Sequence, residues 1–342
     1  MSNLMKNIKK NTVILMIITI LVLFFVLKDN FILVFKNITN INIFWIIIAL
    51  LCVLIYWLSQ SLTIYMMAKE YSEKITFKTV FFQTLITQFF NGVTPFSTGG
   101  QPMAIYMLKE EDMKTSHATS VILQNFLLYQ MALLFIGLIA VIINYSFNLF
   151  PNSDVLRKLI TLGFVINFIV GVGIVFVSFS KRFNKEFVSK IIDFLALIRL
   201  VKNKSKTKKK WDRMLDEFHS SASLLKNDKS LFVKGFLYNL IGLIFLYITP
   251  IFILFSLKNY TSLNLINTIA SSAYVFIMGA FVPIPGGSGG VEYGYLEFFK
   301  YFVPNSLLST SLLLWRFITY YLGILIGGIA LNFYKGGEEK WE

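Results

Sequence analysis

Charged residues, cysteine and histidine are all scarce in this sequence of 342 residues. Only 15% of the residues are charged, whereas soluble domains carry about 25%. The single cysteine, Cys52, excludes a disulfide or a cysteine-based metal site within one chain. Two histidines, His117 and His219, are too few for a histidine metal cluster, and no Gly-Lys-Ser/Thr nucleotide loop is present. We therefore expect no metal ion, no other cofactor and no ATP-driven chemistry.

Long apolar runs take the place of the missing charge. Hydrophobic residues make up 56% of the chain, and a membrane-spanning helix needs about 20 mostly apolar residues. The first run follows three lysines, as in a signal peptide, but it lacks small residues for cleavage, so we expect an uncleaved span. The composition therefore predicts an all-α integral membrane protein. Six segments have the length of a full span: 11–27, 41–68, 117–144, 157–180, 235–257 and 307–334.

Two further apolar segments, 75–108 and 265–303, are interrupted by residues that break helices. These residues are Pro95, Gly99, Gly100 and Pro102 in the first segment, and Pro283, Pro285, Gly286, Gly287, Gly289 and Gly290 in the second. Proline removes a backbone donor and clashes inside a helix, while glycine adds entropy that folding must remove. Non-helical backbone persists at membrane depth only where protein or a wet cavity satisfies its polar groups. Both segments are therefore predicted to be broken helices.

The net charge of +14 is unevenly distributed, and its placement predicts the topology. The stretch 181–234 holds 15 Lys/Arg against 6 Asp/Glu, and positive residues stay in the cytoplasm. If both broken segments dip into the membrane and return, 25 Lys/Arg lie inside, six lie outside, and Arg316 lies within a span. A full crossing by segment 75–108 would place the basic stretch outside. We therefore predict two re-entrant segments and cytoplasmic termini.

The basic stretch also has an amphipathic pattern. Apolar residues recur at helical spacing on both sides of the lysine-rich tract Lys202–Lys210. Two amphipathic helices flanking a basic tract are expected to lie on an anionic inner leaflet. The alternative is a solvated linker that only fixes orientation. The apolar positions are Phe183, Phe187, Ile191, Leu195 and Ile198 before the tract, and Trp211, Leu215, Phe218, Ala222 and Leu225 after it.

The two glycine-rich interruptions resemble each other. Thr94–Gly100 and Ile284–Gly290 both read Pro-x-x-x-Gly-Gly with a hydroxyl residue before the glycine pair. The same offset of 190 residues relates the spans that flank each interruption. The sequence therefore predicts that a unit of span, broken segment and span occurs twice, although chance similarity of two Gly/Pro loops is the alternative.

The predicted repeat defines the domain organisation. We expect a single membrane domain over residues 1–342, with a first repeat over 41–144 and a second over 235–334. The span 157–180 lies between them and inverts the second copy. Inverted repeats of discontinuous helices that meet near the midplane are a transporter architecture.

Two charged residues stand out within the apolar segments, Glu292 after the second glycine loop and Arg316 in the last span. Charges within membrane helices are costly and usually pair or line a pathway. We expect these two to pair, either as a purely structural bond or as one that opens when the guanidinium receives a lipid phosphate. The N–H groups of the short helices after both loops could also hold an anion.

Other polar residues carry weaker signals. Gly286–Gly290 formally matches the G-x-S-x-G motif, but its flanks are apolar and no base is near, so we do not expect a serine hydrolase. Five uncharged side chains are candidates for a cavity, and for each the alternative is hydrogen bonding between helices. These side chains are Gln88, Asn91, Tyr106, Asn125 and Gln130.

The segment Pro283–Glu292 resembles the C-terminal signature of the lysylphosphatidylglycerol synthase transmembrane family. That family includes the membrane half of the bacterial multiple peptide resistance factor and stand-alone flippase-like proteins. Arg316 and the pair Gly99-Gly100 also fit its pattern, whereas Gln101 stands where members often carry an acidic residue. The resemblance covers nearly the whole chain. The candidate headgroup residues are Pro95, Thr98, Gly99, Gly100, Gln101, Pro285, Gly286, Gly287, Ser288, Gly289, Gly290, Glu292 and Arg316.

The resemblance implies a flippase-like protein of the bacterial cytoplasmic membrane that binds an anionic phospholipid and moves lysylphosphatidylglycerol or a related lipid between leaflets. The alternatives are the phosphatidylglycerol lysyltransferase itself, another lipid-linked transferase, or a scaffold for a separate soluble transferase. Nothing in the chain corresponds to the cytosolic transferase domain of full-length members. We therefore expect no catalytic activity of its own and no nucleic-acid partner unless the transferase alternative holds. A homo-oligomer stays open.

Overall fold

The computed structural model describes residues 31–150, 203–280 and 282–334, together with isolated positions between 165 and 196. These parts of the chain are helical and contain no strand. Four helices have the length and composition to cross a membrane, and they confirm four of the six predicted spans. The other two predicted spans, 11–27 and 157–180, lie outside the described residues except for a few positions. The four are α3 (Ile43–Lys69), α6 (Thr115–Phe147), α10 (Lys229–Ser256) and the composite helix Asn305–Phe333.

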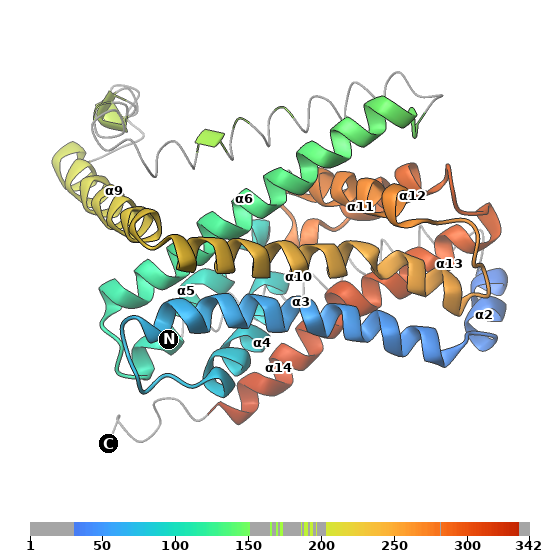
Figure 1. The fold of residues 1–342 in the computed structure, drawn as a ribbon, viewed down its shortest axis with the longest axis horizontal. Helices are drawn as coiled ribbons and strands as arrows, with labels where there is room; N and C mark the ends of the chain where they lie inside the picture. The colour runs from blue at the N-terminus through green and yellow to red at the C-terminus, as the bar shows by residue number, and fades with distance from the viewer. Residues whose placement is uncertain are drawn as a thin grey trace.

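The centre of the bundle is the pair α3 and α10, which pack along each other and run in opposite directions (Figure 1). Side-chain caps start both helices, because Asn42 accepts the N–H of Phe44 and Asp228 accepts the N–H of Leu231. Between them, a Cβ at Gly242 would lie 3.0 Å from the Cβ of Ser59. Small residues thus let the two backbones approach closely, as in many membrane helix pairs.

The first broken segment is present as predicted. It consists of α4 (Phe77–Val93), the short turn η1 (Pro95–Ser97) and α5 (Gly100–Glu110). The helix stops at Thr94, whose extended conformation (φ −114°, ψ 144°) is the one that a residue before proline favours. Phe96 and Ser97 then both take a positive φ of 53°, which is uncommon for residues other than glycine.

The second broken segment has the same plan, with α11 (Leu265–Gly279), the turn η2 (Pro285–Gly287) and α12 (Gly290–Phe299). Ile284 before the proline has nearly the same angles as Thr94, with φ −113° and ψ 145°. Reciprocal hydrogen bonds between Asn264 and Asn267 start α11. Both predicted interruptions are therefore real breaks between two helices.

Each broken segment begins and ends at the same end of the bundle. Val80 early in α4 and Leu108 late in α5 share one buried cluster with Leu231 at the start of α10. Leu263 before α11 and Phe299 at the end of α12 belong instead to the cluster that covers the far half of α10. Figure 1 shows α4 and α5 at one end and α11 and α12 at the other. Each broken segment therefore turns back within the bundle, and the two segments do so from opposite ends.

The last span is not a uniform helix. It comprises α13 (Asn305–Arg316), a π-helical turn η3 (Phe317–Tyr321) and α14 (Leu322–Phe333). The short helix α2 (Phe31–Thr39) packs on α13, where Asn37 donates hydrogen bonds to the carbonyl of Ser306 and the hydroxyl of Thr310. A π turn is rare and is found frequently at functional sites.

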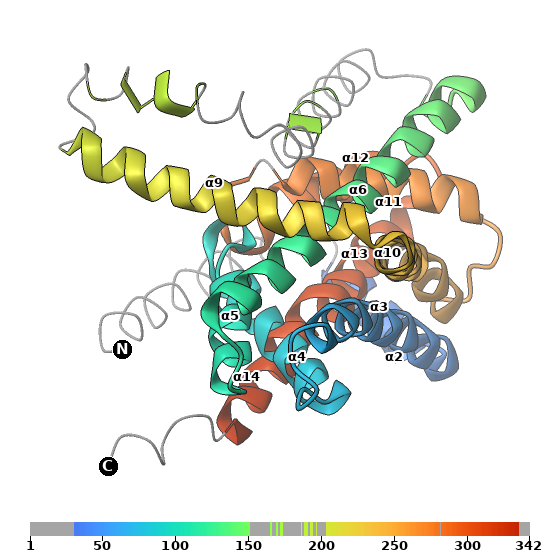
Figure 2. The same cartoon turned by 60° about the vertical axis from the view of Figure 1, so that its left-hand side comes forward.

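The lysine-rich tract differs from the prediction, since it is itself helical from Lys204 onward. Helix α9 (Lys204–Asn227) contains it, and Asn203 caps the first turn by accepting the N–H of Lys206. Lysine is a good helix former, which explains why a tract expected to separate two helices continues one of them. Helix α9 packs against α6 and lies transverse to α10, most clearly in Figure 2 where α10 is seen nearly end-on.

Candidate functional site

The predicted pair of Glu292 and Arg316 is present and buried. The Nε of Arg316 lies 2.6 Å from Oε1 of Glu292, and each side chain is only 6% exposed. The second carboxylate oxygen of Glu292 accepts the N–H of Gly289 at 2.7 Å. Glu292 is the third residue of α12, so its negative charge also lies at the positive end of that helix dipole. The carboxylate therefore joins the second glycine loop to the last span.

The second loop needs glycine for both conformation and space. Gly286 and Gly287 have positive φ values of 63° and 62°, which cost other residues about 1–2 kcal/mol. A Cβ at Gly286 would also overlap the ring of Tyr320. The carbonyl of Gly286 accepts a hydrogen bond of 3.0 Å from Nη2 of Arg316. The arginine therefore holds the loop backbone as well as the carboxylate.

Tyr320 brings the first loop into the same site. Its ring lies beneath the guanidinium of Arg316, 4.5 Å from the guanidinium carbon to the ring centre. Its hydroxyl donates a hydrogen bond of 2.8 Å to the carbonyl of Gly92, in the last turn of α4. One side chain of the π turn thus contacts the charged pair, the second loop and the end of the first broken helix.

The first loop is closed by its own side chains. The hydroxyl of Thr94 accepts the N–H of Gly99 at 2.8 Å, and the amide oxygen of Asn91 accepts the N–H of Gly100 at 2.9 Å. With Gly289 bonded to Glu292, three amides at the starts of α5 and α12 already have partners. The expectation that free N–H groups in both loops hold an anion is therefore wrong at these three positions.

The thirteen predicted headgroup residues gather in one region, because η1 and η2 pack against each other. They differ in exposure. The exposed residues are Pro95, Thr98, Gln101 and Gly289, and the half-buried ones are Gly99, Gly286 and Gly290. The buried ones are Gly100, Pro285, Gly287, Ser288, Glu292 and Arg316.

Ser288 has the environment of a structural serine. Its hydroxyl is buried and donates to the carbonyl of Pro285 at 3.0 Å within the same loop. His117 lies in the first turn of α6, where its ring stacks on that of Tyr71. Among the described residues, no group of acidic, histidine or cysteine side chains could hold a metal ion. The surroundings of Ser288 in the described structure thus contain no paired base of the kind that a nucleophile elbow requires.

The sequence interpretation missed two features of the structure. Tyr320 is one of 16 tyrosines, and only its position four residues after Arg316 could have singled it out. The second feature is a buried amide cluster between α3, α6 and α10, in which Gln60 donates to Asn239 at 2.8 Å. Asn239 donates in turn to Asn125 at 3.4 Å, so Asn125 bonds between helices rather than facing an open cavity.

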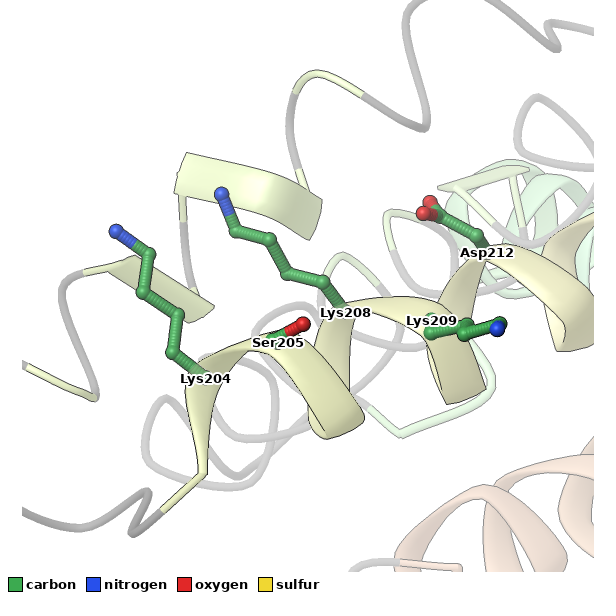
Figure 3. Close-up of a pocket in the computed structure, with 5 residues that line it drawn as sticks. All are labelled: Lys204, Ser205, Lys208, Lys209 and Asp212. Atoms are coloured by element: carbon green, nitrogen blue, oxygen red, sulfur yellow. The ribbon is translucent and has the colours of Figure 1, made fainter.

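A second polar surface lies on α9, away from the charged pair. A hollow there is lined by lysine, serine and aspartate side chains, and Figure 3 shows Lys204 and Lys208 extending to the same side. Both lysines contact Asp193, at 3.1 and 2.8 Å. Their hydrogen bonds, that of Lys208 first, lower the pKa of the Asp193 carboxyl. The residues that line the hollow are Lys204, Ser205, Lys208, Lys209 and Asp212.

Comparison with known proteins gives one family match and one distant relative. The family model described as the lysylphosphatidylglycerol synthase TM region matches residues 12–327, which include both broken segments and the charged pair. A UPF0104 membrane protein of Archaeoglobus fulgidus is 24% identical over 302 residues, covering 84% of this chain and 86% of that protein. The similarity thus extends across the bundle and is not confined to the loops.

Proposed function

The chain belongs to the lysylphosphatidylglycerol synthase transmembrane family, and from this we propose that it binds an anionic or aminoacylated phospholipid and moves it between leaflets. The lipid is of the phosphatidylglycerol or lysylphosphatidylglycerol type. Its phosphate binds Arg316 where the two glycine loops meet. The membrane is the bacterial cytoplasmic membrane, with both termini and α9 on the cytoplasmic side.

The buried guanidinium of Arg316 is the observation that carries this proposal. Guanidinium groups bind phosphate oxygens through two parallel hydrogen bonds. In the closed pair, Glu292 accepts from Nε and the carbonyl of Gly286 accepts from Nη2. Leaving one charge of a buried pair unpaired costs about 3–5 kcal/mol. A phosphate that replaces these acceptors keeps the guanidinium paired, while Glu292 retains its hydrogen bond from the N–H of Gly289, so an anionic headgroup is a suitable partner for opening the pair.

An inverted repeat explains how such a site becomes accessible from both sides. The turns Thr94–Ser97 and Ile284–Gly287 share extended and then positive-φ conformations in the same order. The packing is reciprocal, because α4 packs on α14 while α11 packs on α6, and α3 and α10 pack on each other. These relations support repeats over 41–144 and 235–334 that rock about the loops, as in other transporters with inverted repeats.

A scaffold that presents lipid to a separate soluble transferase is the second candidate. The family description favours it, because it names the membrane region of a synthase. The scaffold and the flippase share the headgroup site. They differ in whether lipid crosses the membrane without a partner enzyme.

Leaflet-resolved lipid movement in proteoliposomes tests the proposal. Labelled phosphatidylglycerol, lysylphosphatidylglycerol and phosphatidylcholine are compared in vesicles with the full chain and in empty vesicles. We expect movement of the first two lipids to exceed that of phosphatidylcholine. Arg316→Lys keeps the charge but loses the paired donors, so it should slow this movement at least tenfold.

Lys300→Gln is the matched control, because Lys300 forms an exposed pair with Glu297 at the end of α12. It should behave like the unmodified protein. Selective lipid binding without movement would favour the scaffold. Equal binding of all three lipids by the unmodified chain would exclude the headgroup site.

A further inference from the structure

Tyr320 is the residue through which the two broken segments meet the charged pair. Its hydroxyl bonds to the Gly92 carbonyl, 228 residues earlier in the chain. Its ring lies under the guanidinium of Arg316 and against Gly286. Arg316 itself holds Gly286 in the second loop. Arg316 and Tyr320, four residues apart on one span, therefore donate hydrogen bonds to the backbone of two different broken segments.

The partner of the Tyr320 hydroxyl is a group that the helix itself cannot satisfy. Gly92 is the residue before the last one of α4. The last four carbonyls of a helix receive no hydrogen bond from the amides of that helix. A buried carbonyl without a donor is costly. The Tyr320 hydroxyl thus caps α4 from another element, and any movement of α4 away from the last span breaks this bond.

The ring of Tyr320 restricts the guanidinium. Glu292 and Gly286 occupy donors at the edge of Arg316, and the aromatic ring lies against its face. Cation–π contacts of this kind stabilise a desolvated cation. Arg316 is therefore enclosed on its edge and on one face as long as Tyr320 stays in place.

The π turn Phe317–Tyr321 gives Tyr320 room to change position. An α-helix rotates successive side chains by about 100°, so a shift of the π turn by one residue would turn Tyr320 away from Arg316. The turn lies directly after Arg316, so such a shift would leave α13 and the arginine backbone unchanged.

We propose that Tyr320 is a positioning residue that locks the Arg316–Glu292 pair to the end of α4, so that phosphate reaches the guanidinium only when the Tyr320–Gly92 bond opens. The inference rests on the proposed headgroup site and adds its regulation. In this arrangement, movement of α4 away from the last span releases Tyr320 and makes the guanidinium of Arg316 accessible to phosphate. The lock thereby couples the position of the first broken segment to the availability of the charge in the second.

Tyr320→Phe tests the lock, because it removes the hydroxyl and keeps the ring. The matched control is Tyr321→Phe, the same change at the next residue. Lipid movement is measured against the fraction of phosphatidylglycerol in phosphatidylcholine vesicles. One hydrogen bond corresponds to about a two- to tenfold change in an equilibrium. We expect the half-saturating fraction of phosphatidylglycerol to fall by that factor in Tyr320→Phe, with a small decrease in melting temperature because the Gly92 carbonyl loses its donor, and with no change in the control.

Hydrogen exchange measured without lipid provides a second readout. In Tyr320→Phe, the amides of Gly99 and Gly100 should exchange about two- to tenfold faster, because the end of α4 is no longer held. Unchanged exchange would overturn the lock whether or not the protein moves lipid. A lower melting temperature without a change in half-saturation would show that the bond is only structural. The unmodified chain could show no selectivity for phosphatidylglycerol while the amides of Gly99 and Gly100 exchange faster in Tyr320→Phe. That result would support the role of Tyr320 and reject the proposed lipid.

Discussion

The guanidinium of Arg316 lies 4.5 Å above the ring of Tyr320, one turn further along the same span. The contact places a charged and an aromatic side chain on one face of the helix. Each then reaches the backbone of a different broken segment, Arg316 at Gly286 and Tyr320 at Gly92. The last span is thus the element that holds the two loops together.

The first prediction concerns the pair itself. Glu292→Gln and Arg316→Gln should each destabilise the protein by about 3–5 kcal/mol, because one buried charge is left unpaired. The double variant leaves no charge and should recover most of the melting temperature. It should not recover lipid movement, since no guanidinium remains for phosphate. Detergent melting and leaflet-resolved lipid movement in all four forms measure both quantities.

Full recovery of transport in the double variant would reject the role of Arg316 as phosphate receptor. Single variants that melt and transport like the unmodified protein would show that the pair contributes neither to stability nor to function.

The second prediction distinguishes space from conformation in the second loop. Gly286→Ala should destabilise the protein by more than the roughly 1–2 kcal/mol of a positive φ, because its methyl group also meets the Tyr320 ring. Gly289→Ala is the control, since it has a positive φ of 89° and nothing within 4 Å of the added Cβ. Melting temperatures of both variants provide the comparison. Equal losses of stability in the two variants would mean that the Tyr320 ring moves aside without an energetic cost.

The third prediction concerns the cap of α5. Asn91→Ala removes the acceptor of the Gly100 N–H and should cost about 1 kcal/mol, the usual value for loss of a cap. The replacement Asn91→Asp keeps an acceptor and should lose less stability. Melting of the two variants measures the difference. If both lose the same stability, the oxygen of Asn91 is not the important group.

The fourth prediction concerns the membrane surface. Lys206, Lys209 and Lys210 are exposed on α9, together with Trp211 at 43%. Each lysine near an anionic leaflet contributes about 1 kcal/mol. Replacing all three with glutamine should weaken the binding of anionic lipid, and salt should reduce the difference. Lipid profiles of the purified proteins and the accessibility of α9 measure the effect.

Asp193→Asn is the opposite change and provides the control for α9. It frees Lys204 and Lys208 from their shared carboxylate, so it should strengthen the binding of anionic lipid. An unchanged lipid profile and topology in both variants would support a solvated helix that serves only orientation.

The sequence predicted those features that follow from the cost of polar groups in lipid. Pro95 and Pro285 identified both breaks, because proline cannot continue a helix. Glu292 and Arg316 were predicted to pair, because isolated charges are rare in spans. Four spans were also predicted to within a few residues, except that α10 begins at Lys229 rather than near 235.

Features that depend on distant backbone groups were not predictable in this way. The bond from Tyr320 reaches a carbonyl, and a carbonyl has no sequence signature. Asn91 caps an amide nine residues away across the loop, beyond the spacing of local capping motifs. The lysine tract was expected to separate two amphipathic helices, because its charge density was given more weight than the helix propensity of lysine.

The packing of α4 on α14 has a consequence for biosynthesis. Gly92 leaves the ribosome 228 residues before Tyr320, which at ordinary elongation rates is a delay of roughly 10–45 s. During that interval α4 can pack on α3 and α5 but lacks α14, and the carbonyl of Gly92 lacks its donor. The first broken segment therefore reaches its final packing only after α14 has been made. Truncation before α14 should leave α4 and α5 open to protease while α3 and α6 are already inserted.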